Sequence, residues 1–185
     1  LIARPVTQLY STPEKSPITS WAYSILGQIY VVLPLALLGV WGYKSDYQLF
    51  MNTEYLLMAL FVFVWTNDTG AYIVGCTLGK HRLFERISPK KSWEGFFGGL
   101  AFCIILASLA NYIIPGMLST AQWIGMGILT SIFSTWGDLC ESLLKRTAGV
   151  KDSGKILPGH GGILDRFDSE LIASPVIFIY LTFVL

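Results

Sequence analysis

The sequence predicts an all-α membrane protein, a multi-pass bundle of about five membrane-spanning helices with cytoplasmic polar loops. Three properties of its 185 residues support this fold class: 53% are hydrophobic, 14% are charged, and the mean hydropathy is +0.56. Soluble domains are about 25% charged, so a lipid bilayer suits this composition better than water. The net charge of +1 gives no reason to expect a nucleic-acid partner.

Five apolar runs are the predicted spans. A spanning helix needs about 20 mostly apolar residues, and the alternating pattern of membrane β-strands is absent. The runs cover residues 21–43, 55–77, 95–115, 121–144 and, cut short, 171 onward. We expect a single integral membrane domain over residues 1–185. We also expect a fragment of a longer chain, because the sequence begins without a methionine and stops inside an apolar run.

The basic residues define the orientation of these spans. With one crossing per run, every one of the 13 Lys and Arg residues except Lys44 falls on the same side of the membrane. The positive-inside rule makes that side cytoplasmic. We therefore expect an integral protein of the cytoplasmic (inner) membrane whose polar loops, residues 81–91 and 145–170, face the cytoplasm together with the active site.

Four carboxylates lie inside or at the ends of the predicted spans: Asp68, Glu94, Asp138 and Glu141. A charge at the centre of a bilayer costs at least about 2.5 kcal/mol, so such residues usually face the protein interior or a wet cavity. For Glu94, a snorkelling or paired charge at a helix end is an equal alternative. Asp138 has no Lys or Arg one turn before it, which calls for a metal ion or a proton as its partner.

Small residues in the same runs indicate helix contacts. Ser131 and Ser134 share a helix face with Asp138, and we interpret them as residues that hold helices together. Gly95 and Gly99 have the spacing of a close helix contact.

The segment Ser-Pro-Lys-Lys at residues 88–91 is interpreted as a helix start, with Ser88 as the N-cap. Lys90 and Lys91 would then carry the wrong charge for a helix N-terminus unless an anion binds there. We expect them to bind a phosphate group. The alternative is a solvated cytoplasmic anchor for the helix.

Residues 142–168 form the predicted cytoplasmic signature loop, with five basic residues, three acids and five glycines. Glycine lets the backbone approach a phosphate closely, Lys and Arg neutralise its charge, and carboxylates hold Mg²⁺ against it. The composition therefore indicates phosphate and metal chemistry, although composition alone is weak because many cytoplasmic loops are flexible and positive.

The order of residues in this loop resembles the signature of the phosphatidate cytidylyltransferase (CDP-diacylglycerol synthase) family. Residues 67–72 and 88–95 are also similar to blocks of that family, so the resemblance covers most of residues 65–169. The residues that match the signature are Ser142, Lys145, Arg146, Lys151, Asp152, Pro158, His160, Gly161, Gly162, Asp165, Arg166 and Asp168.

The resemblance implies a nucleotidyltransferase of phospholipid biosynthesis that converts CTP and phosphatidic acid to CDP-diacylglycerol and pyrophosphate, with Mg²⁺ and room for a second cation. The expected metal ligands are Asp138 and Asp165. The expected catalytic residues are Asp68, Lys145, Arg146, Asp152 and Asp168. The expected substrate-binding residues are Lys90, Lys91, Ser142, Lys151, His160, Gly161, Gly162 and Arg166. For His160, an idle loop histidine is an equal alternative.

The sequence alone leaves two other functions possible. It is also compatible with a homodimer. A CTP-dependent lipid or polyprenol kinase would use the same basic loop but transfer the γ-phosphate. An ion-coupled transporter would use Asp68 and Asp138 as relays, although the carboxylates and lysines gather at one membrane face and not at the midplane.

Overall fold

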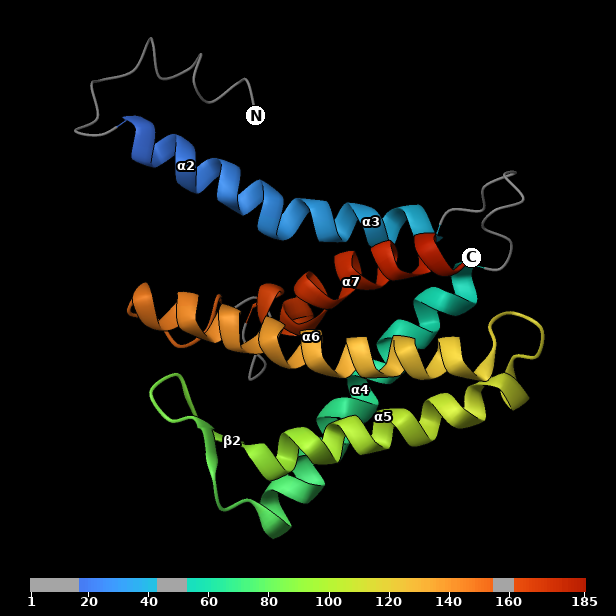
Figure 1. Cartoon of the computed structure of the whole chain (residues 1–185). Coiled ribbons are helices and arrows are strands. Elements are labelled where there is room, and N and C mark those ends of the chain that lie inside the picture. The colour runs from blue at the N-terminus through green and yellow to red at the C-terminus, as the bar shows by residue number, and fades with distance from the viewer. Residues whose placement is uncertain (1–16, 43–52, 155–161) are drawn as a thin grey trace.

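The chain folds into a bundle of long helices with one short β-hairpin (Figure 1). The computed structural model describes residues 17–42, 53–154 and 162–185. Its elements in chain order are α2 (Pro17–Gly27), η1 (Gln28–Val32), α3 (Leu33–Gly42), α4 (Thr53–Leu78), β1 (Arg82–Phe84), β2 (Ser88–Ser92), α5 (Trp93–Ile113), α6 (Thr120–Thr147) and α7 (Leu164–Val184). The predicted helical membrane bundle is confirmed, and the hairpin is an addition to it.

Four helical stretches are long and apolar enough to cross a membrane: Ile18–Val40, Glu54–Leu78, Trp93–Ile113 and Leu164–Val184. The first of them joins α2, η1 and α3, so its middle is a π-helical segment. α6, with 28 residues, is long enough as well, but polar and charged side chains interrupt its apolar surface. These spans make the chain an integral membrane protein.

Glycines allow α4 and α5 to pack closely. A Cβ atom at Gly99 would lie 2.5 Å from Asn67 Oδ1, and one at Gly95 would lie 2.8 Å from the carbonyl oxygen of Ala71. Real Cβ atoms do not come so close, so each position needs a residue without a side chain. The prediction that Gly95 and Gly99 mediate a helix contact is confirmed.

Asn67 joins α4 to α6 through three hydrogen bonds and is only 2% exposed. Its Oδ1 accepts from Ser131 Oγ at 2.6 Å, and its Nδ2 donates to Ser134 Oγ at 3.2 Å and to Thr135 Oγ1 at 3.4 Å. Buried polar groups are tolerated inside a bundle when they pair with one another in this way. The interpretation of the two serines as residues that hold helices together is confirmed.

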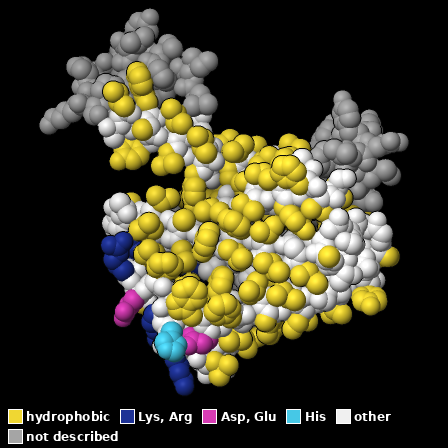
Figure 2. All heavy atoms as spheres, in the orientation of Figure 1, with side chains coloured by type: hydrophobic (Ala, Val, Ile, Leu, Met, Phe, Trp, Pro, Cys, Tyr) yellow, Lys and Arg dark blue, Asp and Glu magenta, His cyan; other side chains and the backbone are white. Residues whose placement is uncertain are grey.

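The apolar core and the basic residues occupy different ends of the bundle. Phe63, Cys103, Trp123 and Met126 are almost fully buried, and the rings of Phe63 and Trp123 lie 6.3 Å apart. At the other end, where α5 begins and α6 ends, lie all the Lys and Arg residues of the described ranges. Figure 2 shows these charges gathered at one edge of a surface that is otherwise largely hydrophobic.

The predicted helix start at Ser88 is wrong. The segment forms β2, which pairs antiparallel with β1, and α5 begins only at Trp93. Ser92 is the N-cap, because its hydroxyl accepts a hydrogen bond from the Gly95 N–H at 3.1 Å. Either serine could cap a helix, and the one followed by an acidic first turn does so.

Lys90 and Lys91 therefore lie on a strand and not in the first turn of a helix. Glu94 stands in that turn, where a negative charge is favourable. Its carboxylate accepts a hydrogen bond from the His81 N–H at 3.2 Å and lies 2.6 Å from His81 Nδ1. Glu94 is thus the paired helix-end charge of the alternative interpretation, and it closes the hairpin against α5.

Candidate functional site

The helices α4 and α6 end, and α5 and α7 begin, toward the charged end of the bundle. Between α4, α6 and α7 lies a cavity of about 350 Å³, which we call the acidic cavity. Its polar lining residues are Asp68, Asp138, Asp165, Arg166, Asp168, Ser169 and Glu170. Because five carboxylates and one guanidinium line it, this cavity attracts cations and repels a phosphate unless further cations neutralise it.

The helix α7 contributes much of this lining, because it begins at Leu164, inside the segment that was predicted as a polar loop over residues 145–170. Asp165 therefore stands in the first helical turn, where a carboxylate is favoured by the helix dipole. Asp168 follows three residues later, on the same face of the helix. The helical pattern thus extends into the segment that the sequence suggested as a polar loop.

The Asp165 carboxylate accepts the hydrogen bonds that hold the signature loop against the helices. Its Oδ2 accepts hydrogen bonds from the Gly162 N–H at 2.7 Å, from the Ser153 N–H at 2.9 Å and from Ser153 Oγ at 2.8 Å. Its Oδ1 accepts from Lys145 Nζ at 2.7 Å. One carboxylate therefore ties the loop to both α6 and α7.

Lys145 bridges two carboxylates, Asp165 and Glu141. The Glu141 side chain is 1% exposed and that of Lys145 15% exposed. Burial alone would lower the pKa of the Lys145 ammonium, but the hydrogen bond to Asp165 and the ion pair with Glu141 outweigh burial and raise the pKa. Lys145 is therefore charged at neutral pH and already neutralised by its neighbours.

A Schellman motif ends α6 and turns the chain back over the bundle. The N–H of Gly149 donates to the carbonyl of Arg146 at 3.1 Å, and the N–H of Val150 donates to that of Lys145 at 3.0 Å. Gly149 has a φ of 71°, a conformation that glycine adopts at low cost. This turn directs the loop toward the start of α7, where Ser153 reaches Asp165.

Asp138 has a basic partner that the sequence did not suggest. Lys91 Nζ, from β2, lies 2.5 Å from Asp138 Oδ2, and Ser142 Oγ donates to Oδ1 at 3.2 Å. The expectation that Asp138 needs a metal ion or a proton as its partner is corrected, because a lysine from another element pairs with it. The side chains are 27% and 32% exposed, so this ion pair is open to substitution by a ligand.

A second cavity, of about 210 Å³, lies between α4, α5 and β2 and is called the lysine cavity here. Lys90 and Lys91 line it, together with the rings of Tyr72 and Phe96. Asp68 lines both cavities, so the two adjoin. Two ammonium groups beside aromatic rings suit a phosphorylated ligand with a planar base.

The structure brings together most residues that the sequence singled out. In or beside the acidic cavity lie Asp68, Asp138, Asp165, Arg166 and Asp168, with Ser142, Lys145 and Gly162 hydrogen-bonded to them. Exposed at the end of α6 and in the following loop are Arg146, Lys151 and Asp152. His160 and Gly161 lie outside the described residues.

Sequence reasoning missed two residues, one in the acidic cavity and one in the middle of the first membrane span. Glu170 is 3% exposed and lines the acidic cavity. It was assigned to the end of a loop, and its position two residues after Asp168 and next to an apolar run was the signal that could have identified it. Tyr30, in η1, has a buried hydroxyl, and nothing in its apolar sequence neighbourhood points to a site.

The carboxylates suit a hard divalent cation such as Mg²⁺. Mg²⁺ takes one or two carboxylates from a protein and completes its shell with water and substrate phosphates. Within the described ranges, no three Asp, Glu, His or Cys residues are already grouped to hold a metal ion. Asp138 has one partner on each oxygen and keeps a lone pair on both, whereas three donors occupy Oδ2 of Asp165 and only its Oδ1 keeps a lone pair beside Lys145. One oxygen from each aspartate therefore fits a cation shared with a substrate phosphate.

Comparisons with known proteins identify the family. The profile of the Cytidylyltransferase family matches residues 1–184. The chain is 41% identical over 160 residues to the phosphatidate cytidylyltransferase of Staphylococcus aureus (strain COL), a match that covers 86% of this chain and 61% of that protein. The protein of the same name from Staphylococcus haemolyticus (strain JCSC1435) is 41% identical over 159 residues, with the same coverage.

A third similar protein, the phosphatidate cytidylyltransferase of Staphylococcus epidermidis (strain ATCC 12228 / FDA PCI 1200), is 40% identical over 159 residues. The chain spans 61% of the length of these curated relatives. Because the family profile matches nearly every residue of the chain, the chain belongs to the cytidylyltransferase family.

Proposed function

We propose that the protein transfers the cytidylyl group of CTP to phosphatidic acid, which forms CDP-diacylglycerol and releases pyrophosphate. The observation that carries this proposal is the adjoining of an acidic cavity and a lysine cavity, through Asp68, at one end of membrane helices. A nucleotide dissolved in water and a phosphate anchored in a bilayer meet at such a boundary. The names of the staphylococcal relatives support the choice of substrates.

In the proposed reaction, an oxygen of the phosphatidate attacks the α-phosphorus of CTP and forms a new P–O bond. The bond between the α-phosphorus and the oxygen that bridges it to the β-phosphorus breaks, and pyrophosphate leaves with that oxygen. This transfer needs no covalent enzyme intermediate, so catalysis comes from alignment and charge neutralisation. Lys90 and Lys91 hold the triphosphate in the lysine cavity, and Tyr72 and Phe96 flank the base there.

The lipid phosphate approaches the acidic cavity from the side of the signature loop in this proposal. Lys145 and Arg166 neutralise it, while the exposed Arg146 and Lys151 attract both phosphorylated substrates to the site. The backbone N–H groups of the signature-loop glycines add donors for the same anions. Asp152 stands at the rim of this site, where we assign it the role of orienting a neighbouring lysine.

Asp138 and Asp165 are the proposed ligands of Mg²⁺. When bound there, the ion neutralises charge on the phosphate oxygens of the transition state. Asp68 and Asp168 line the same cavity and keep it attractive to cations. We place the second cation of this proposal among the other three carboxylates of the cavity, Asp68, Asp168 and Glu170.

We place the site on the cytoplasmic side of the inner membrane. The support is the distribution of charge, because every Lys and Arg in the described ranges lies at the end of the bundle that holds both cavities. The positive-inside rule assigns such an end to the cytoplasm.

Purified full-length protein, incubated with phosphatidic acid, Mg²⁺ and each of the four nucleoside triphosphates, tests the proposal. We expect release of pyrophosphate with CTP and little with the other three. Radiolabelled CTP separates the alternatives: CDP as the product would replace the proposal with a lipid kinase. Ion flux in sealed liposomes without any nucleotide would replace it with a transporter.

A further inference from the structure

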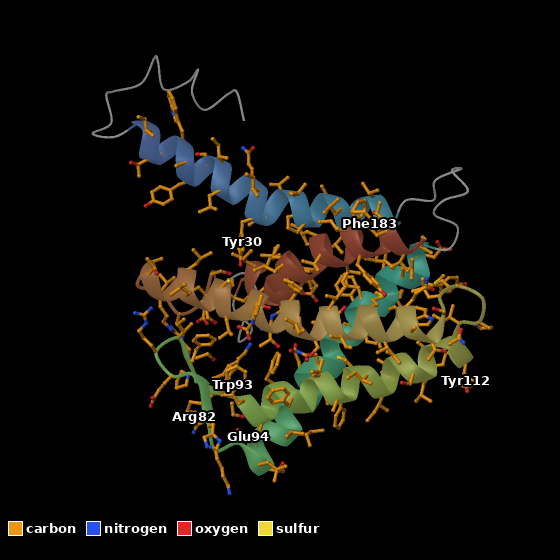
Figure 3. The ribbon with its side chains drawn as sticks, viewed as in Figure 1. Tyr30, Arg82, Trp93, Glu94, Tyr112 and Phe183 are labelled. Atoms are coloured by element: carbon orange, nitrogen blue, oxygen red, sulfur yellow. The ribbon has the colours of Figure 1, made fainter. Side chains whose placement is uncertain are left out.

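Tyr30 stands at the centre of the π-helical segment η1, halfway along the first membrane span. Figure 3 shows it on the side of this span that faces the rest of the bundle. Short π-helical turns are rare and frequently occur at functional sites. The Tyr30 hydroxyl is buried and has no hydrogen-bond partner among the described residues.

A buried hydroxyl without an acceptor is unfavourable, so this one requires an explanation. Three carboxylates, Glu141, Asp168 and Asp138, carry the negative charges that act on this phenol. Both oxygens of Glu141 are, like the Tyr30 hydroxyl, buried and without a hydrogen bond among the described residues. Glu141 is the most buried carboxylate of the three. The hydroxyl is therefore a spare buried donor, and Glu141 offers two buried oxygens whose partner within the described residues is the Lys145 ammonium group.

Once a substrate binds, its phosphate and the Glu141 carboxylate compete for the Lys145 ammonium group. In the structure the Lys145 ammonium group forms ion pairs with both Glu141 and Asp165. A phosphate that draws Lys145 toward itself weakens the contact with Glu141. Because a buried carboxylate that loses its cation is strongly destabilised, phosphate binding would be weak unless another donor took the place of Lys145.

We propose that Tyr30 is this donor, a positioning residue whose hydroxyl turns to the Glu141 carboxylate when Lys145 moves toward a substrate phosphate. A neutral phenol suits the task, since it stabilises the carboxylate without adding a second cation that would compete with Lys145 for the phosphate. Only hydrogen bonds are exchanged, and no proton is transferred. This role rests on the proposed function, because the phosphate belongs to CTP or to phosphatidic acid.

The test is Tyr30→Phe in the full-length protein, which removes the hydroxyl and keeps the ring. The matched control is Tyr23→Phe on the same span, where the side chain is 70% exposed. Steady-state kinetics are measured with CTP and with dioleoyl phosphatidate in mixed micelles, each varied in turn. Tyr30→Phe should raise the KM of at least one substrate by roughly tenfold, the size of a hydrogen bond to a charged group, while kcat changes less.

Tyr23→Phe should change neither constant. Equal KM values for the wild-type protein and Tyr30→Phe would overturn the proposed role. A wild-type protein that releases no pyrophosphate from CTP and phosphatidate would refute the proposed function instead, so the two failures are distinguishable.

Glu141→Gln identifies the partner of the hydroxyl. A neutral amide needs no replacement donor, so Tyr30→Phe should have no further effect on KM in the Glu141→Gln background. The same tenfold effect in both backgrounds would show that the hydroxyl acts elsewhere and would overturn the pairing. If Glu141→Gln does not fold, the comparison of Tyr30→Phe with Tyr23→Phe decides alone.

Discussion

Lys145 is the residue whose removal should destabilise this end of the bundle most. Its ammonium group lies 2.7 Å from Asp165 Oδ1 and also pairs with Glu141, whose side chain is 1% exposed. The substitution Lys145→Met keeps most of the side-chain length and removes the charge. Two carboxylates then face the same space with no cation between them.

The magnitude follows from the surroundings of the two carboxylates. Removal of one partner from a buried ion pair costs about 3–5 kcal/mol. Asp165 keeps its hydrogen bonds to Ser153 and Gly162, and Lys145 is 15% exposed, so we expect a cost near the lower end of that range. For a chain of this size about 1 kcal/mol corresponds to 2–4 °C, which predicts a decrease in Tm of roughly 6–12 °C.

The assay is thermal unfolding of the detergent-purified protein, followed by tryptophan fluorescence. Lys151→Met is the matched control, because Lys151 is exposed in the following loop and its loss should leave Tm almost unchanged. Adding Glu141→Gln to Lys145→Met should recover part of the lost Tm, since the uncompensated buried charge disappears. If Lys145→Met and Lys151→Met unfold at the same temperature, the carboxylates do not depend on Lys145 and the reasoning fails.

Three further substitutions test the packing and the orientation. Gly99→Ala should destabilise the bundle by about 1–3 kcal/mol because its Cβ would meet Asn67, whereas Gly27→Ala, with nothing within 4 Å, should not lower Tm. Asn67→Ala should also lower Tm, because it leaves the hydroxyls of α6 without their partner and reduces the free energy of unfolding by about 1–3 kcal/mol. Lys151→Cys, in a variant without the native cysteines, should react with a membrane-impermeant maleimide only from the cytoplasmic side, and labelling from the opposite side would contradict the proposed orientation.

The positions of the helices follow largely from the sequence because apolar length is a strong local signal. This signal is weakest where the first turns of a helix consist of polar residues. For this reason the start of α5 was placed wrongly, at Ser88, and the first two turns of α7 were assigned to a polar loop that ended at residue 170. For α5, the unfavourable charge of the lysines after Ser88 was already an indication that Ser92 and its acidic first turn were the better choice.

The sequence also predicts which residues gather at the candidate site, but it does not predict which side chains pair with one another. Asp138 pairs with Lys91, which comes from a strand far away in the chain, and only the fold brings the two together. Glu170 and Tyr30 lie within or beside apolar runs, where one polar residue carries little signal of its own. Periodicity along one helix cannot show which residue of another helix faces it.

Pyrophosphate release by the Asp138→Asn variant shows whether the acidic cavity performs nucleotidyl transfer. The control is Glu54→Gln, the same acid-to-amide change in the first turn of α4, at the end of the bundle away from both cavities. With CTP, phosphatidic acid and Mg²⁺, we predict that Asp138→Asn lowers turnover by at least about 100-fold, the scale expected for loss of transition-state charge stabilisation, while Glu54→Gln keeps wild-type turnover. Turnover near the wild-type rate in folded Asp138→Asn protein would contradict the account.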